Sequence, residues 1–253
     1  MQPVKRAVGG GMIENDRTKY SGLGRWGQVV SLFLSVSSLS ALVVALVMAP
    51  PRSGPFCRGN DCITFPYTDA AAHVPNDYVW MYFAVVMSLA FLAWVVCVVS
   101  ESSPSVTGTG VFAVVLATVA TTVLLFAYGV QLLVMQPSLV KGETEGLSPW
   151  SQYNPQGIFI ALECLGYWLA ALALIGVASM FQGTSRIDRW RRWIALLAGS
   201  VTVALLPIMG LIYRSDLEYR YEVIAIAILW PAFTVLGVLC TRASRRLSRI
   251  EMS

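Results

Sequence analysis

Six long apolar runs restrict the fold of this chain more than any other feature of its sequence. A bilayer core is crossed by about 20 predominantly apolar residues in helical form, and a helix satisfies its own backbone hydrogen bonds there. Only 13% of the 253 residues are charged and 56% are hydrophobic, which excludes a soluble enzyme, a disordered chain and a disulfide-stapled secreted module. The sequence therefore predicts an all-α, polytopic transmembrane bundle of six spans, at residues 26–49, 78–100, 111–136, 157–181, 193–213 and 221–240.

The distribution of lysine and arginine predicts the orientation of these spans. Cytoplasmic segments of membrane proteins carry an excess of both residues. With the N-terminus inside, thirteen of the 18 basic residues fall in cytoplasmic segments and five in outer ones. We therefore expect a multi-pass protein of the plasma membrane with both termini cytoplasmic. Its parts are a cytoplasmic segment at 1–25, a transmembrane domain at 26–241 and a basic cytoplasmic tail at 242–253.

Two outer loops are long, at residues 50–77 and 137–156, and contain several aromatic residues. Loops longer than about 12–15 residues are usually functional or disordered, and the aromatic content favours packing against the bundle. Cys57 and Cys62 lie in the first loop, where an oxidising compartment permits a disulfide. We expect a structural disulfide, with a redox-active pair as the alternative. Cys97, Cys164 and Cys240 are expected to act as small apolar residues.

The inventory of reactive side chains excludes several kinds of site. The sequence contains one histidine, His73, so a bis-histidine haem site or an HExxH zinc site cannot form. It has no GxxxxGK[ST] phosphate loop, and its basic residues flank the spans, so we expect no cofactor and no nucleic-acid partner. Asp69, His73 and Asp77 could together hold a metal ion. Loop capping is the favoured interpretation, and no metal is expected.

Glu163 is the acidic residue that lies well inside a predicted span. A charged side chain at the centre of a membrane helix costs about 2.5–3.5 kcal/mol on insertion scales, so Glu163 should face protein or water. Residues at helical spacing around it form a stripe that lets another helix approach closely. That stripe is Phe159, Glu163, Gly166, Ala170 and Ala173, with Tyr167 one turn further, and a matching stripe is predicted at Thr118, Thr121, Leu125, Tyr128 and Gln131.

Depth in the membrane brings these polar residues together. At 1.5 Å of rise per residue, Gln131 and Glu163 both lie about 8–9 Å below the outer interface, and Glu222 belongs to the same leaflet. We therefore name Glu163, Gln131, Tyr128 and Tyr167 as candidates for a ligand or proton site. The alternative is a structural clamp, in which Gln131 or Tyr128 satisfies the Glu163 carboxyl. No catalytic residue is assigned.

Two stretches of the chain carry a resemblance. The segments FPYTDAAAHVPNDYVWMY (residues 65–82) and QPSLVKGETEGLSPWSQYNPQGIFIALECLGY (residues 136–167) resemble a family of uncharacterised prokaryotic multi-pass integral membrane proteins of about six spans. The resemblance covers the two outer loops and the spans after them, and it implies no activity. It agrees with the emphasis on Glu163. Where the family has an acidic residue after the glutamate of IALE, this chain has Cys164.

The leading hypothesis is that the protein binds or passes a small or amphiphilic ligand through an outward-facing cavity in the outer leaflet half. One alternative is a non-catalytic accessory subunit of a larger membrane complex. Another is a membrane enzyme of lipid or thiol chemistry, which a second carboxylate or a reactive thiol near Glu163 would favour. The expected partners are the lipid bilayer, the ligand, and either a membrane protein or a second copy of this chain.

Overall fold

The computed structural model describes residues 24–49, 51–59, 61–102 and 107–250, with side chains described except at 107 and 246–250. Within these residues the chain is helical and contains no strand. Six helical segments are long and apolar enough to cross a membrane, which confirms the predicted all-α, six-span bundle. The helices that form them are α2 (Arg25–Met48), α3 (Val79–Ser100), α4 (Thr107–Val130), α6 (Ile158–Ala178), α7 (Arg186–Tyr213) and α8 (Arg220–Ile250).

Three helices extend further than the apolar runs that predicted them. A π-helical turn (Gln131–Met135) follows α4 directly, and α5 (Gln136–Lys141) continues it into the predicted second outer loop. Helix α7 begins at Arg186 instead of 193, because the Ser185 hydroxyl caps it by accepting the backbone N–H of Asp188 at 3.1 Å. Helix α8 runs on to Ile250, into the predicted tail. Hydropathy marks where a chain enters lipid, whereas backbone hydrogen bonds decide where a helix ends.

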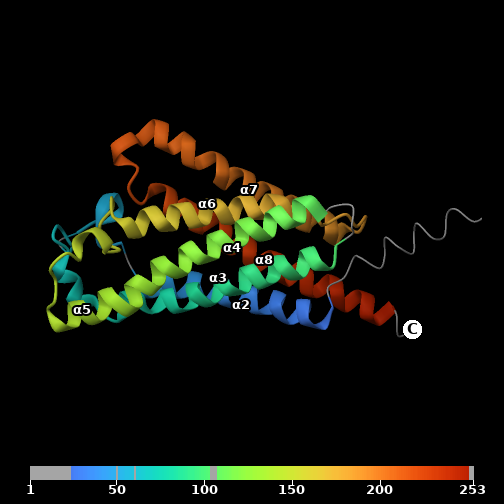
Figure 1. Ribbon diagram of the computed structural model, residues 1–253, viewed down its shortest axis with the longest axis horizontal. Helices are drawn as coiled ribbons and strands as arrows, with labels where there is room; N and C mark the ends of the chain where they lie inside the picture. The colour runs from blue at the N-terminus through green and yellow to red at the C-terminus, as the bar shows by residue number, and fades with distance from the viewer. Residues whose placement is uncertain (1–23, 50, 60, 103–106, 251–253) are drawn as a thin grey trace, which may run out of the picture.

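The six spans form a closed ring. Each helix packs against its neighbours in the order α2, α3, α4, α6, α7, α8, and α8 packs back against α2. Helix α6 also contacts α8 across the ring. Both long loops lie at one end of the elongated bundle, and the described C-terminal end of α8 lies at the other (Figure 1). The ring therefore places α6 in contact with both α4 and α8 beneath the two loops.

Small residues allow the helices to approach closely. A Cβ atom added at Gly166 of α6 would lie 2.6 Å from Leu124 of α4. Gly237 of α8 faces the backbone and side chain of α2 even more tightly, against Ser35. At this crossing the Ser35 hydroxyl donates to the backbone carbonyl of Thr234 at 2.9 Å. Such close crossings are the usual basis of helix association in lipid, where apolar side chains gain little from leaving the solvent.

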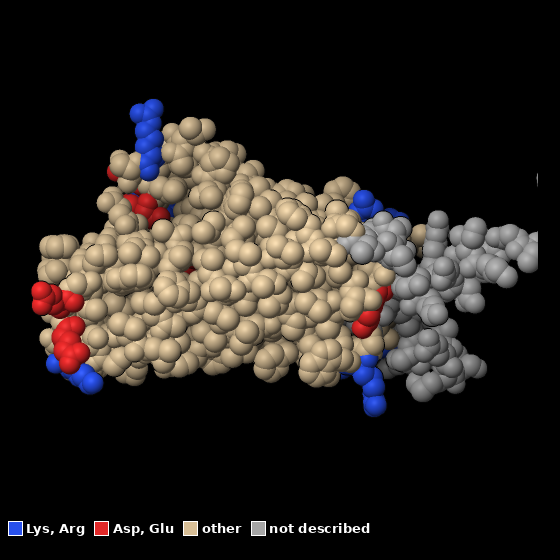
Figure 2. Space-filling model, viewed as in Figure 1, with Lys and Arg blue, Asp and Glu red and all other residues tan. Residues whose placement is uncertain are grey.

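The outer surface of the ring is apolar. Large side chains point outward from several spans, and Leu133 and Leu211 are each 78% exposed. On the face shown in Figure 2, acidic and basic side chains gather at the two ends and leave a wide uncharged band between them. A soluble protein rarely exposes apolar surface on this scale. The chain is thus an integral membrane protein of the multi-pass type.

The first long loop contains the expected disulfide. Cys57 and Cys62 are joined, with Cα atoms 5.9 Å apart. The remaining cysteines are free thiols: Cys97 and Cys240 are buried and Cys164 is half-buried.

The crossing of α2 and α8 gives the first prediction. Gly237→Ala should lower stability by about 1–3 kcal/mol, because the new methyl group must displace backbone in a tightly packed contact. Gly210→Ala in α7 is the matched control, since a Cβ at that helical position meets nothing within 4 Å. Thermal unfolding of the purified variants in detergent, followed by circular dichroism, measures the difference. Equal melting midpoints for the two variants would contradict the packing described at this crossing.

Candidate functional site

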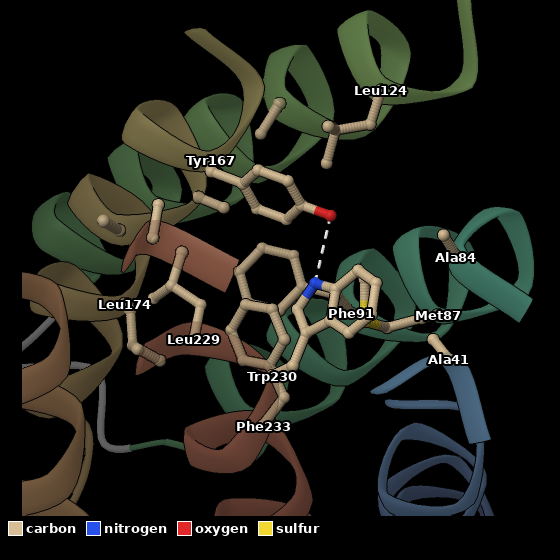
Figure 3. Close-up of a cluster of buried hydrophobic side chains, with 14 of the residues drawn as sticks. Ala41, Ala84, Met87, Phe91, Leu124, Tyr167, Leu174, Leu229, Trp230 and Phe233 are labelled. Atoms are coloured by element: carbon tan, nitrogen blue, oxygen red, sulfur yellow. Dashed lines mark hydrogen bonds between the residues drawn. The ribbon is translucent and has the colours of Figure 1, made fainter. Parts of the chain in front are cut away.

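A buried chain of hydrogen bonds links α4, α6 and α8 in the half of the bundle nearest the long loops. The Tyr128 hydroxyl donates to Glu163 Oε1 at 2.6 Å and lies 2.7 Å from the Tyr167 hydroxyl. Trp230 Nε1 donates to the Tyr167 hydroxyl at 3.0 Å, as Figure 3 shows. Because Tyr128 gives its proton to Glu163, Tyr167 must donate to Tyr128. The hydrogen bonds therefore run in one direction, from Trp230 to Glu163, and all four side chains are fully buried.

A second carboxyl group meets the end of this chain. Glu222 of α8 is 8% exposed, and its carboxyl group lies close enough to that of Glu163 for the two side chains to share a hydrogen bond. Neither Oε2 atom of the pair finds an N–H, hydroxyl or amide donor among the described residues. A hydrogen bond between two carboxyl groups requires a proton on one of them. The two carboxyl groups can therefore hold a proton between them inside the bundle.

Glu222 is the site residue that sequence reasoning missed. Its sequence signal is ambiguous, because it lies in the first turn of α8. There an acidic side chain is also favoured by the partial positive charge of the helix N-terminus. The sequence predicted the leaflet in which Glu222 lies but not its contact with Glu163 across the ring. Its depth, shared with Glu163, is the feature that could have identified it.

A cavity of about 420 Å³ opens beside the hydrogen-bond chain, at the end of the bundle that carries the long loops. It lies between the C-terminal half of α2, the start of α3, the first turns of α8 and parts of both loops. Trp230 belongs both to the cavity wall and to the hydrogen-bond chain, and Glu222, which contacts the other end of that chain, also lines the cavity. The wall is mainly aliphatic and aromatic, with a few polar groups: Leu42, Ala45, Leu46, Ala49, Pro51, Arg52, Ser53, Phe56, Asp77, Trp80, Gln152, Tyr153, Tyr219, Glu222, Val223, Ile226, Ala227 and Trp230.

The outer rim of the cavity is fixed by an ion pair. Arg52 Nε lies 2.5 Å from Asp77 Oδ2, and the Tyr153 hydroxyl donates to the same oxygen at 2.9 Å. The hydrogen bond from Arg52 to Asp77 raises the pKa of the Arg52 guanidinium. Burial raises the pKa of the Tyr153 hydroxyl. Arg52 is therefore charged and already paired. The pair joins the first loop to the start of α3 and to the second loop.

A second contact joins the loops on the other side of the rim. The hydroxyls of Ser53 and Tyr219 lie 2.7 Å apart, and Tyr219 also donates to the backbone carbonyl of Gln152 at 3.1 Å. Burial is the main cause of the raised pKa of Tyr219. This hydroxyl is therefore a neutral donor that ties the segment before α8 to both loops.

The structure brings three of the four candidate residues together. Tyr128, Glu163 and Tyr167 form the core of the hydrogen-bond chain. Gln131 is fully buried but lies outside it, because its Nε2 donates to the backbone carbonyl of Trp150 at 2.5 Å. Gln131 begins the π-helical turn and holds the second loop against the end of α4. Of the two residues proposed for a clamp on Glu163, Tyr128 is the one in contact.

The stripe predicted around Glu163 lies inside the bundle, whereas the matching stripe on α4 is partly wrong. Thr118 is exposed and its hydroxyl bonds to its own helix, at Val114, and Leu125 is half-buried. The buried face of α4 is mostly alanine, which lets α6 approach closely. Side-chain size, and not polarity, distinguishes the buried residues of α4, which are Ala113, Ala117, Ala120, Thr121, Leu124, Ala127 and Tyr128. Gln131, directly after the helix, is also buried.

Asp69, His73 and Asp77, the loop residues that could hold a metal ion, do not form a metal site in the described structure. Asp77 is paired with Arg52 at the cavity rim. Among the described residues, no three His, Cys, Asp or Glu side chains are arranged to hold a metal ion.

No family model matches the chain, and neither curated proteins nor solved structures show a significant match. The resemblance of two stretches to multi-pass membrane proteins stays a prediction. Any functional inference therefore rests on the geometry of this chain.

The hydrogen-bond chain gives the second prediction. Tyr128→Phe should destabilise the protein by about 1–3 kcal/mol, because the buried Glu163 carboxyl loses a donor and Tyr167 loses a partner. Tyr82→Phe is the matched control, since Tyr82 is 54% exposed on α3. The melting midpoints of both variants in detergent, compared with the unaltered protein, measure the effect. Equal melting midpoints for Tyr128→Phe and Tyr82→Phe would show that the hydrogen-bond chain does not stabilise the protein.

Proposed function

We propose that this protein binds or passes a small or amphiphilic ligand through the cavity beneath its two long loops. The cavity's 420 Å³ is within the range of about 300–1,000 Å³ typical of small-molecule sites. Such sites combine apolar walls with a few polar groups that orient the ligand. This wall has that composition. The observation that carries the proposal is that one cavity joins apolar walls to a buried carboxyl group, that of Glu222.

The shape of the wall supports an amphiphilic ligand. Leu46 of α2 and Val223 of α8 line the cavity and are 76% and 45% exposed. Helices α2 and α8 are neighbours in the ring. A ligand dissolved in the membrane would therefore meet the cavity from the side. Its apolar part would lie against α2 and α8, and its polar part would lie toward the polar groups of the wall, among them Glu222.

The proposal includes an orientation: the two long loops face the outside of the plasma membrane and both termini are cytoplasmic. The excess of basic residues at the opposite end supports it. In a variant with Cys97, Cys164 and Cys240 replaced, a cysteine at Glu145→Cys should react with a membrane-impermeant maleimide on intact cells. A cysteine at Thr184→Cys, in the turn before α7, should react only after the cells are opened. The reverse pattern would invert the orientation.

A membrane enzyme is the second candidate, because a second carboxyl group does lie beside Glu163. Glu163 and Glu222 are the kind of pair that can share acid and base roles. Glu222 lines the cavity, whereas Glu163 is fully buried and does not line it. A reaction would therefore use Glu222 as the group that meets a substrate. Incubation with mixed phospholipids, followed by mass spectrometry of the lipid extract, would reveal products that Glu222→Gln fails to form.

The cavity gives a direct test of the proposed ligand binding. N-phenyl-1-naphthylamine, an uncharged apolar fluorophore, should bind saturably to the protein in lipid nanodiscs, after subtraction of empty discs. Ala227→Phe places a ring in the cavity and should weaken this binding at least about fivefold, because the apolar volume is lost. Ala161→Phe, on the exposed face of α6 and away from the cavity, should leave it unchanged. Equal binding by the two variants would reject the cavity as the site.

A further inference from the structure

The charges that line the cavity are unbalanced. Among the described residues, its charged wall side chains are Arg52, Asp77 and Glu222. Arg52 and Asp77 neutralise one another, at 2.5 Å. Glu222 forms no ion pair in the described part of the chain, where the nearby Arg220 is instead paired with Glu218. The cavity therefore contains an acidic group with no basic partner.

The position of Glu222 makes that imbalance costly. Its side chain is more than nine-tenths buried, within a helix of membrane-spanning character, and its Oε2 lacks a donor group. Ionisable groups in such positions are retained where they contact an ion, a proton pathway or a ligand. Glu163 provides the neighbouring carboxyl, and a hydrogen bond between the two groups requires one proton on the pair. A second proton on the pair becomes unnecessary when a cation lies beside Glu222 and balances its charge.

Aromatic side chains complete the surroundings of a cation. Trp80, Trp230, Tyr153 and Tyr219 line the same cavity as Glu222. Trp80 and Trp230 are in contact, with ring centroids 6.0 Å apart. Aromatic rings attract organic cations through the negative potential of their faces, and they do so most strongly where water is excluded.

We propose that the cavity binds an organic cation with an apolar body, with the Glu222 carboxylate as counter-charge and the aromatic side chains around its apolar part. The inference rests on the proposed function and names the class of ligand. Glu222 is the binding group. Glu163 is a positioning residue, because its carboxyl group is in side-chain contact with that of Glu222.

Two probes of the same shape and opposite charge test the sign of this site. Tetraphenylphosphonium is a cation and tetraphenylborate is an anion, and both are large and apolar. Isothermal titration calorimetry of the unaltered protein in neutral-lipid nanodiscs, with empty discs subtracted, should give saturable binding of the cation. The anion should bind at least about tenfold more weakly, a difference of about 1.4 kcal/mol. Equal affinities, or tighter binding of the anion, would overturn the inference without any variant.

Variants then assign the counter-charge to one residue. Glu222→Gln should weaken cation binding at least about tenfold. Glu163→Gln should weaken cation binding less, by about threefold, because its amide still contacts Tyr128 and Glu222 but positions Glu222 less well. Glu145→Gln, in the loop and outside the cavity, removes the same charge and should have no effect. Size-exclusion profiles show that each variant is folded. Equal losses for Glu222→Gln and Glu163→Gln would overturn the assignment of Glu222 as the binding group.

The uncharged fluorophore separates this inference from the proposed function. If N-phenyl-1-naphthylamine binds in a manner sensitive to Ala227→Phe, but the two charged probes bind equally, the cavity is a ligand site without preference for cations. If the fluorophore and the cation both bind regardless of Ala227→Phe, the proposed function itself fails. Cation binding that is lost in both Ala227→Phe and Glu222→Gln supports both proposals.

Discussion

The close approach of helices at small residues is the contact on which the rest of this structure depends. In a bilayer, apolar side chains gain little from turning inward, so helices associate through tight packing and a few polar contacts. Gly237 allows α8 to lie against α2, and Gly166 allows α6 to lie against α4. These crossings close the ring of six helices. The closed ring then fixes which polar side chains face one another in its interior.

The buried layer around Glu163 is polar, and its polar side chains are tolerated there because they contact one another. Glu163 is fully buried, and Tyr128 and Glu222 provide its polar contacts. The chain of hydrogen bonds continues through Tyr167 to Trp230, which also lines the cavity. A change in what occupies the cavity would therefore act directly on groups joined to Glu163. This continuity is why ligand binding and proton sharing are proposed for the same place.

The cavity owes its shape to the loops as much as to the helices. Arg52, Asp77 and Tyr153 join the first loop, the start of α3 and the second loop in one partly buried contact. Tyr219 adds the segment before α8. Gln131 holds the second loop to the end of α4 through the carbonyl of Trp150. Residues far apart in the sequence thus close one end of the bundle around a space of 420 Å³.

The sequence by itself determined the six spans, the disulfide in the first loop and the buried position of Glu163, because hydropathy and helical spacing are local properties. It also predicted that Tyr128 and Tyr167 lie near Glu163, since depth follows from rise per residue. Only the tertiary structure decided that Glu222 meets Glu163, that Gln131 binds a loop carbonyl and that alanines form the inner face of α4. Those outcomes depend on how each helix is rotated about its axis. That rotation is set by the size of side chains on neighbouring helices, and the sequence of one span does not show which helices will be its neighbours.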